Sequence, residues 1–109
     1  MSVTELDTEL MLRMKQGESV CMEALLHRHR APVIHFIHRR VQSQAIAEEL
    51  AQNVFLRIYM SRGKYEPTAK FTTWMFRIAG NLALNWIRDR RRERTDVSIS
   101  ARMPRGEEV

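Results

Sequence analysis

The sequence has one cysteine, Cys21, and no apolar run long enough to span a lipid bilayer. A lone cysteine cannot form an internal disulfide, and its neighbours Val20, Met22 and Leu25 predict an ordinary buried thiol without a redox role. The N-terminus also lacks the basic segment followed by an apolar stretch that marks a signal peptide. These absences predict a cytosolic protein that does not insert into membranes.

Proline and glycine are scarce, with 3 and 4 copies, and they fall where helical periodicity breaks. No internal repeat is present. A chain of 109 residues can build one core but not two full domains. We therefore expect an all-α fold, a compact bundle of about four helices followed by a polar C-terminal tail.

Capping residues and helix breakers divide the first half of the chain into two predicted helices. The first begins at Thr4, with Asp7 as a capping-box partner, and closes at Gly17. Ser19 is expected to cap the second, which should kink or break at Pro32 because proline disrupts a helix interior.

A third helix is predicted over residues 45–62, before Gly63. Its apolar face consists of Ile46, Ala47, Leu50, Val54 and Ile58. The opposite side mixes polar and large apolar residues, namely Glu49, Gln52, Asn53, Leu56 and Met60. Such a mixture is typical of a helix that docks on another protein. Single exposed apolar residues are also common on any protein surface, so both interpretations stay open.

A fourth helix is predicted over residues 71–94. Its buried face consists of Phe71, Met75, Ile78, Ala79, Leu82 and Trp86. Along one edge lie Trp74, Arg77, Asn81, Asn85 and Arg88, three or four positions apart. The indole can stack on a base, the amides can bond base edges, and the arginines can bind phosphates, so this edge suits unstacked nucleic acid. The alternative is a solvated helix side with a half-buried tryptophan.

The end of this helix is rich in arginine, with Arg88, Arg90, Arg91, Arg92 and Arg94. Because the net charge is +5 and the pI about 10.1, this cluster favours a polyanionic partner over a small acidic substrate. The loop over residues 64–70 precedes the helix and carries Lys64, Tyr65 and Lys70. It could close over a flipped base, or it could be a plain connector.

The four histidines raise metal binding as an alternative to nucleic-acid binding. We interpret His27, His29, His35 and His38 as surface residues, because no CxxC or HExxH motif accompanies them. We expect no metal, no cofactor and no enzymatic activity.

The segment AEELAQNVFLRIYMSRGKYEPTAKFTTWMFRIAGNLALNWIRDRRR resembles region two, the promoter-melting domain, of the extracytoplasmic-function sigma factors of bacterial RNA polymerase. The likeness covers roughly residues 5 to 94. It implies that Glu49, Gln52, Asn53, Leu56 and Met60 dock on the clamp helices of the polymerase β′ subunit. In that family Asp is more frequent at the position of Glu49, and Glu at that of Asn53.

The same resemblance implies a DNA site for the non-template strand of the minus-ten promoter element. The loop with Lys64, Tyr65 and Lys70 and the helix with Trp74, Asn81 and Asn85 would hold the unpaired strand, with a flipped base in a pocket that includes Asn81. The DNA backbone would contact Arg77, Arg88, Arg91 and Arg92. An anti-sigma protein is an expected further partner.

The expected organisation is a region 2 domain over residues 1–94 and an interdomain linker or tail over 95–109. The second, helix-turn-helix domain of such factors is absent from the sequence, which suggests a fragment. Two rival functions remain: a helical module bound only by a regulator protein, and a basic RNA-binding domain. A regulator-only module would bind single-stranded DNA no better than its charge predicts.

Overall fold

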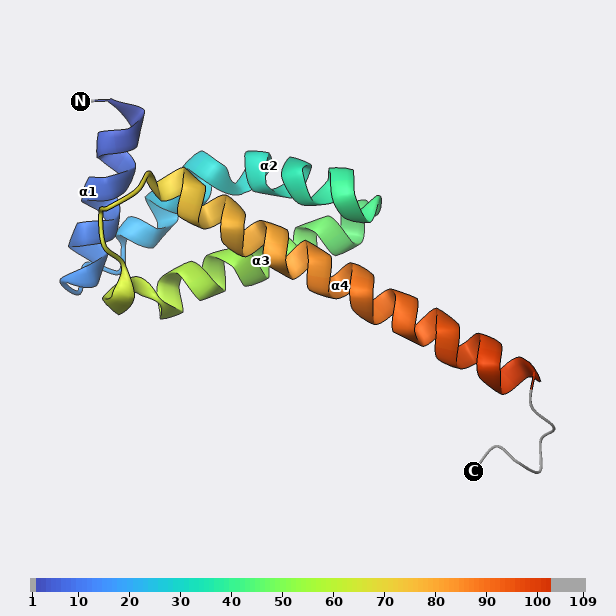
Figure 1. Ribbon diagram of the computed structural model, residues 1–109. Helices are drawn as coiled ribbons and strands as arrows, with labels where there is room; N and C mark the ends of the chain where they lie inside the picture. The colour runs from blue at the N-terminus through green and yellow to red at the C-terminus, as the bar shows by residue number, and fades with distance from the viewer. Residues whose placement is uncertain (1, 103–109) are drawn as a thin grey trace.

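Four α-helices and one short 3-10 helix make up the part of the chain that the structure describes (Figure 1). The computed structural model describes the backbone of residues 2–102 and the side chains of residue 2 and residues 4–94. The elements are α1 (Val3–Lys15), α2 (Cys21–Val41), α3 (Gln44–Met60), η1 (Arg62–Lys64) and α4 (Phe71–Arg102). No strand occurs in these residues, so the predicted all-α bundle is confirmed.

The helices pack around one core. α2 contacts both α3 and α4, α3 contacts α4, and α1 lies across one end of these three helices against α2, η1 and α4 (Figure 1). Each helix contributes one apolar stripe, as the periodicity predicted. The largest fully buried side chains are Phe71, Met11, Met14, Leu25, Ile37, Ile58 and Met75. Cys21 is buried as predicted, with 4% of its surface exposed.

The predicted caps of the first two helices are wrong. Ser2, not Thr4, caps α1: the Ser2 hydroxyl accepts from the Glu5 amide, and the Glu5 carboxylate accepts from the Ser2 amide. Asp7 is not the capping-box partner, because α1 begins at Val3 with Glu5 in that position, and Oδ1 of Asp7 bonds Arg28 and His29 of α2 instead. α2 begins after Val20 without any side-chain cap, so Ser19 does not have the predicted role.

Pro32 does not break α2, which is helical from Cys21 to Val41. An interior proline costs a helix about 3 kcal/mol or more. The same helix buries Val33, Ile34 and Ile37 against its neighbours. This packing explains why the helix continues, since tertiary burial outweighs local propensity.

α4 is longer than predicted and ends at Arg102 instead of Arg94. Residues 95–102 contain neither proline nor glycine, and an existing helix gains one hydrogen bond for each residue added. Residues 95–102, the first part of the expected linker or tail, are therefore helical, and residues 103–109 lie outside the described residues. α4 projects well past the ends of the other helices (Figure 1). None of the described helices combines the length and apolar composition needed to cross a bilayer.

Candidate nucleic-acid interface

The loop before α4 is anchored to the first helix. The Lys15 ammonium group in α1 donates a 2.8 Å hydrogen bond to the main-chain carbonyl of Tyr65. The side chain of Tyr65 is 3% exposed, and its ring lies 5.4 Å from the indole of Trp74. Tyr65 was expected to face a ligand from the loop. In the structure its ring packs in the core against Trp74, and the residue also lines the cavity beside that indole.

Trp74 is held by an aromatic cluster and remains partly exposed. The ring of Phe71, the first residue of α4, lies 6.0 Å from the indole in an edge-on arrangement. Phe71 itself lies 5.4 Å from the ring of His29 in α2. Because buried neighbours surround it on the core side, the indole has a defined orientation before any ligand arrives.

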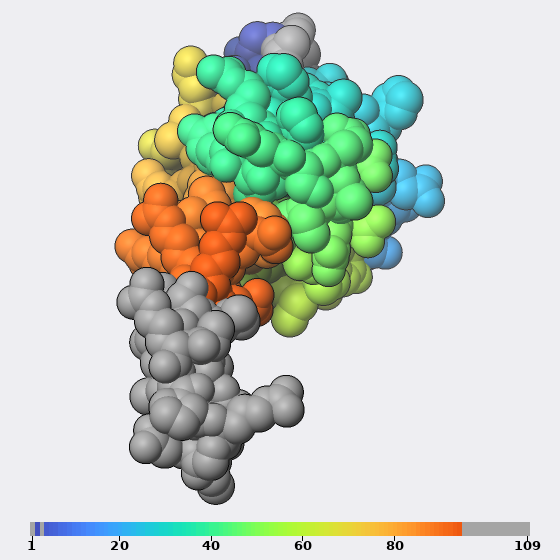
Figure 2. Space-filling view, turned by 90° about the vertical axis from the view of Figure 1, so that its right-hand side faces the viewer, coloured from blue at the N-terminus to red at the C-terminus, as the bar shows by residue number. Residues whose placement is uncertain are grey.

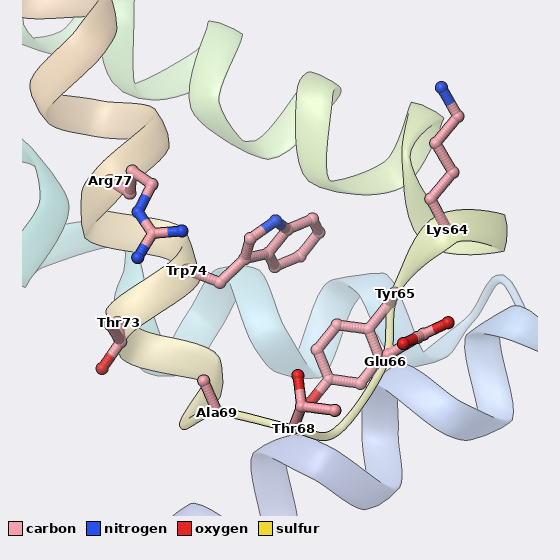
Figure 3. Close-up of a pocket in the computed structure, with 8 residues that line it drawn as sticks. All are labelled: Lys64, Tyr65, Glu66, Thr68, Ala69, Thr73, Trp74 and Arg77. Atoms are coloured by element: carbon pink, nitrogen blue, oxygen red, sulfur yellow. The ribbon is translucent and has the colours of Figure 1, made fainter.

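A cavity of about 280 Å³ opens beside Trp74 (Figure 3). Its walls come from the segment between Lys64 and Ala69 and, on α4, from Thr73, Trp74 and Arg77. The indole projects from α4 toward the Lys64 segment, with the Tyr65 ring beneath it in this view (Figure 3). The predicted loop and helix edge thus come together in one site, which we call the loop cavity. Lys70, also predicted for this site, is exposed but does not line it.

Asn81 lines a different cavity, of about 270 Å³, between the end of α3 and α4. We call it the α3–α4 groove. Its other lining residues are Arg57 of α3, Ser61 directly after α3, Lys64 of η1, and Trp74 and Ile78 of α4. Sequence reasoning missed Arg57 and Ser61. The signal available was weak, because their helical spacing of four places them on one side of α3 but does not say which helix faces them.

The remaining predicted DNA-binding residues lie farther along α4. Asn85, Arg88, Arg91 and Arg92 are all exposed, Asn85 beside the core-packed Trp86 and the arginines beyond Ile87. Figure 2 shows α4, in orange, emerging beside the C-terminal end of α2. Arginines on a projecting helix can reach a polyanion without rearranging the core, so this end of α4 offers an extended cationic surface.

The polar and apolar side of α3 is exposed, as its pattern predicted. Glu49, Gln52 and Asn53 face solvent, Leu56 is 55% exposed and Met60 is 71% exposed. The other side of the helix buries Ala47, Leu50, Val54 and Ile58. Two large apolar side chains on one helix face provide anchors of the kind that protein interfaces use.

The histidines do not gather around a common point. Among the described residues, no group of three or more His, Cys, Asp or Glu side chains is placed to hold a metal ion. His27 and His35 are exposed and His38 is partly exposed. His29 was expected at the surface but is only 7% exposed, with Nε2 2.9 Å from Oδ1 of Asp7. The buried carboxylate explains the difference, since Oδ1 of Asp7 gives the imidazole a hydrogen-bond partner inside the core.

The family model described as sigma-70 region 2 matches residues 25–93. The chain belongs to this family. The match runs from the first half of α2 to the arginine-rich part of α4, so it includes the exposed side of α3 and both cavities beside Trp74. The family resemblance of the sequence is thereby confirmed.

Several curated relatives are sigma factors. The RNA polymerase sigma factor CarQ of Myxococcus xanthus is 40% identical over 81 residues, which cover 74% of this chain and 47% of CarQ. The sigma-H factor of Pseudomonas aeruginosa is 29% identical over 101 residues, covering 93% of this chain and 52% of that protein. The ECF sigma factor SigW of Bacillus subtilis is 27% identical over 79 residues, covering 72% and 42%. The sigma region 2 chain thus spans about half the length of the curated relatives it matches.

A solved structure has the same fold as this sigma region 2 domain. It is an NMR structure of an engineered region 2 of sigmaE in complex with GTAAAA, with a TM-score of 0.74 and 28% sequence identity. The match covers 85% of this chain and 97% of the other. The helical arrangement therefore occurs in a relative that was solved together with this ligand.

Proposed function

We propose that this sigma region 2 domain docks on core RNA polymerase and captures the unpaired non-template strand of the minus-ten promoter element. The observation that carries the proposal is the position of Trp74, a half-buried indole between two cavities on the arginine-bearing helix. The relative in complex with GTAAAA supports the assignment.

The proposed mechanism is capture, without a covalent step. Unstacking and unpairing a base costs a few kcal/mol, and stacking on an aromatic side chain returns about 1 to 3 kcal/mol per base. Trp74 provides that stacking surface, and Asn81 offers both a donor and an acceptor to a base edge. Arg77, Arg88, Arg91 and Arg92 contribute phosphate contacts that hold the strand in register. RNA synthesis belongs to the polymerase.

Lys64, Lys70 and Asn85 complete the proposed DNA surface as exposed groups around these residues. Tyr65 contributes from beneath, because its buried ring packs on Trp74 and its carbonyl is tied to Lys15. Its proposed role is therefore to position the indole that meets the base.

The exposed side of α3 is the proposed docking surface for the β′ clamp helices, through Glu49, Gln52, Asn53, Leu56 and Met60. Its two apolar anchors lie among polar groups, which suits a partner that binds and releases. An anti-sigma protein that covers this same side would keep the factor from the polymerase in the cytoplasm. Binding of a regulator protein, which was one of the rival functions, would then be a part of the proposed function.

Fluorescence anisotropy of labelled single strands tests the proposal. GTAAAA and a scrambled strand of the same composition are titrated with the domain, alone and with core polymerase, across a salt series. We expect GTAAAA to bind more tightly, with a preference that core polymerase strengthens and Asn81→Ala weakens. Asn81 is exposed, so circular dichroism of this variant should be unchanged. Equal binding of both strands without core association would reject the promoter assignment and favour a regulator-only module.

A further inference from the structure

The first helix, α1, is connected to both aromatic rings that pack on the Trp74 indole, those of Tyr65 and Phe71. α1 lies before residues 25–93, which the family model matches. We propose that α1 sets the orientation of the indole through two separate series of contacts, which begin at Lys15 and at Asp7. These two residues are thus positioning residues of the single-strand site, and the inference rests on the proposed function.

The first series begins at Lys15, in the last turn of α1. Its ammonium group donates the 2.8 Å hydrogen bond to the carbonyl of Tyr65, and a bond with one charged partner is roughly twice as strong as a neutral one. Because the two residues are 50 positions apart in sequence, this bond fixes the start of the loop against the body of the domain. The buried ring of Tyr65 then lies 5.4 Å from the indole (Figure 3).

The second series begins at Asp7, in the middle of α1. Its Oδ1 lies 2.9 Å from Nε2 of His29, which restricts the orientation of the imidazole ring. That ring lies 5.4 Å from Phe71, whose own ring meets the indole edge-on at 6.0 Å. Asp7, His29 and Phe71 are all buried, so the position of α1 is passed on to the indole through close packing.

A fixed indole favours binding, because the DNA strand then does not have to order it. Trp74 is only partly buried, and it has to present a flat face to a base. Ordering a mobile side chain on binding lowers the affinity about two- to tenfold. The contacts with α1 remove this cost, because the indole is already ordered when the domain has folded.

Time-resolved fluorescence anisotropy of Trp74 measures this order directly. Trp86→Phe leaves Trp74 as the only tryptophan, and every protein in the test carries this substitution. Lys15→Met removes the ammonium group but keeps an unbranched chain, and it should fold because Lys15 is exposed. Asp7→Asn keeps the shape of the side chain and weakens the bond to His29 by removing the charge.

We expect Lys15→Met and Asp7→Asn to increase the nanosecond motion of the indole. They should also weaken binding of fluorescein-labelled GTAAAA about two- to tenfold, the effect of one side chain that must be ordered on binding. If Asp7→Asn does not fold, Lys15→Met decides alone.

Arg13→Met is the matched control. Arg13 is the other cation in the last turn of α1, and its exposed side chain pairs with Glu18 at 2.7 Å. Both substitutions remove one positive charge, so a purely electrostatic effect on DNA binding should be the same in both. We expect Arg13→Met to leave the motion of the indole unchanged and to weaken GTAAAA binding less than Lys15→Met. Urea unfolding of both variants shows whether their stability is the same.

The outcomes separate the two proposals. Greater indole motion in Lys15→Met than in Arg13→Met, together with weaker GTAAAA binding, supports the positioning role of α1. Unchanged motion in Lys15→Met, the same change in Arg13→Met, or greater motion without weaker binding would overturn that role and leave promoter binding intact. Equal binding of GTAAAA and a scrambled strand by the domain with Trp86→Phe alone would reject the proposed function. The anisotropy of Trp74 is measured without DNA, so it would still decide whether α1 orients the indole.

Discussion

Oδ1 of Asp7 in α1 lies 2.9 Å from Nε2 of His29 in α2, and both side chains are buried. The same oxygen accepts a 2.9 Å hydrogen bond from Nε of Arg28. Since His29 also contacts Phe71 at the start of α4, this polar cluster joins the first helix to the base of the proposed DNA site.

We predict that Asp7→Ala lowers the free energy of unfolding by about 3 kcal/mol, because it leaves the buried His29 and the partly buried Arg28 without their acceptor. Urea unfolding followed by circular dichroism measures the loss. Glu9→Ala is the control, since Glu9 is an exposed carboxylate on the same helix and should change stability by less than about 0.5 kcal/mol. Equal losses in the two variants would contradict a structural role for the cluster.

Gly80→Ala should stabilise the domain by about 0.5 to 1 kcal/mol, because glycine is unfavourable inside a helix. A Cβ at Gly80 would meet the Phe36 ring at 3.9 Å, an ordinary contact distance. Gly17→Ala should lower stability instead, by more than about 1 kcal/mol, because Gly17 has a φ of +107°. Thermal unfolding of both variants checks the opposite signs; a lower midpoint for Gly80→Ala would show that Phe36 cannot accept the methyl group.

Arg92→Gln should weaken all single strands by a similar factor and reduce the log–log salt slope of binding by about 0.7, the value for one lost phosphate contact. Anisotropy titrations of GTAAAA and a scrambled strand at several salt concentrations measure this. Arg13→Gln serves as the control, because Arg13 is an exposed arginine on α1 paired with Glu18 at 2.7 Å. A sequence-dependent effect of Arg92→Gln, or an unchanged slope, would argue against a phosphate contact.

Leu56→Asp should lower affinity for core polymerase about tenfold or more, as expected when a charge replaces an apolar anchor of an interface. Stability should change little because the side chain is 55% exposed. Competition with a labelled unmodified domain for core polymerase measures the affinity. Val20→Asp alters another exposed apolar residue, 69% exposed and outside α3, and should leave binding unchanged. Equal effects of the two substitutions would place the docking surface elsewhere.

Helical periodicity assigned most of the buried and exposed positions, although Ile46, Ile78 and Trp86 of the predicted apolar faces are only partly buried. The buried stripe with Met75 and Ala79 on α4, and the exposed Leu56 and Met60 on α3, follow from spacings of three and four residues. Helix ends were less predictable. Ser2 and Glu5 form the cap that Thr4 and Asp7 were expected to form. The carboxylate of Asp7 instead bonds Arg28 and His29 of α2.

The amino-acid pattern thus determined the all-α class, the composition of each helix face and the family to which the chain belongs, since these depend on residues close together in sequence. Tertiary structure alone decided that Tyr65 is buried against Trp74, that His29 pairs with Asp7, and that Asn81 and Arg57 line one groove separate from the loop cavity. Each of these relationships joins different elements of the chain. Local periodicity states which side of a helix is apolar, but only packing of the helices determines which side chains meet there.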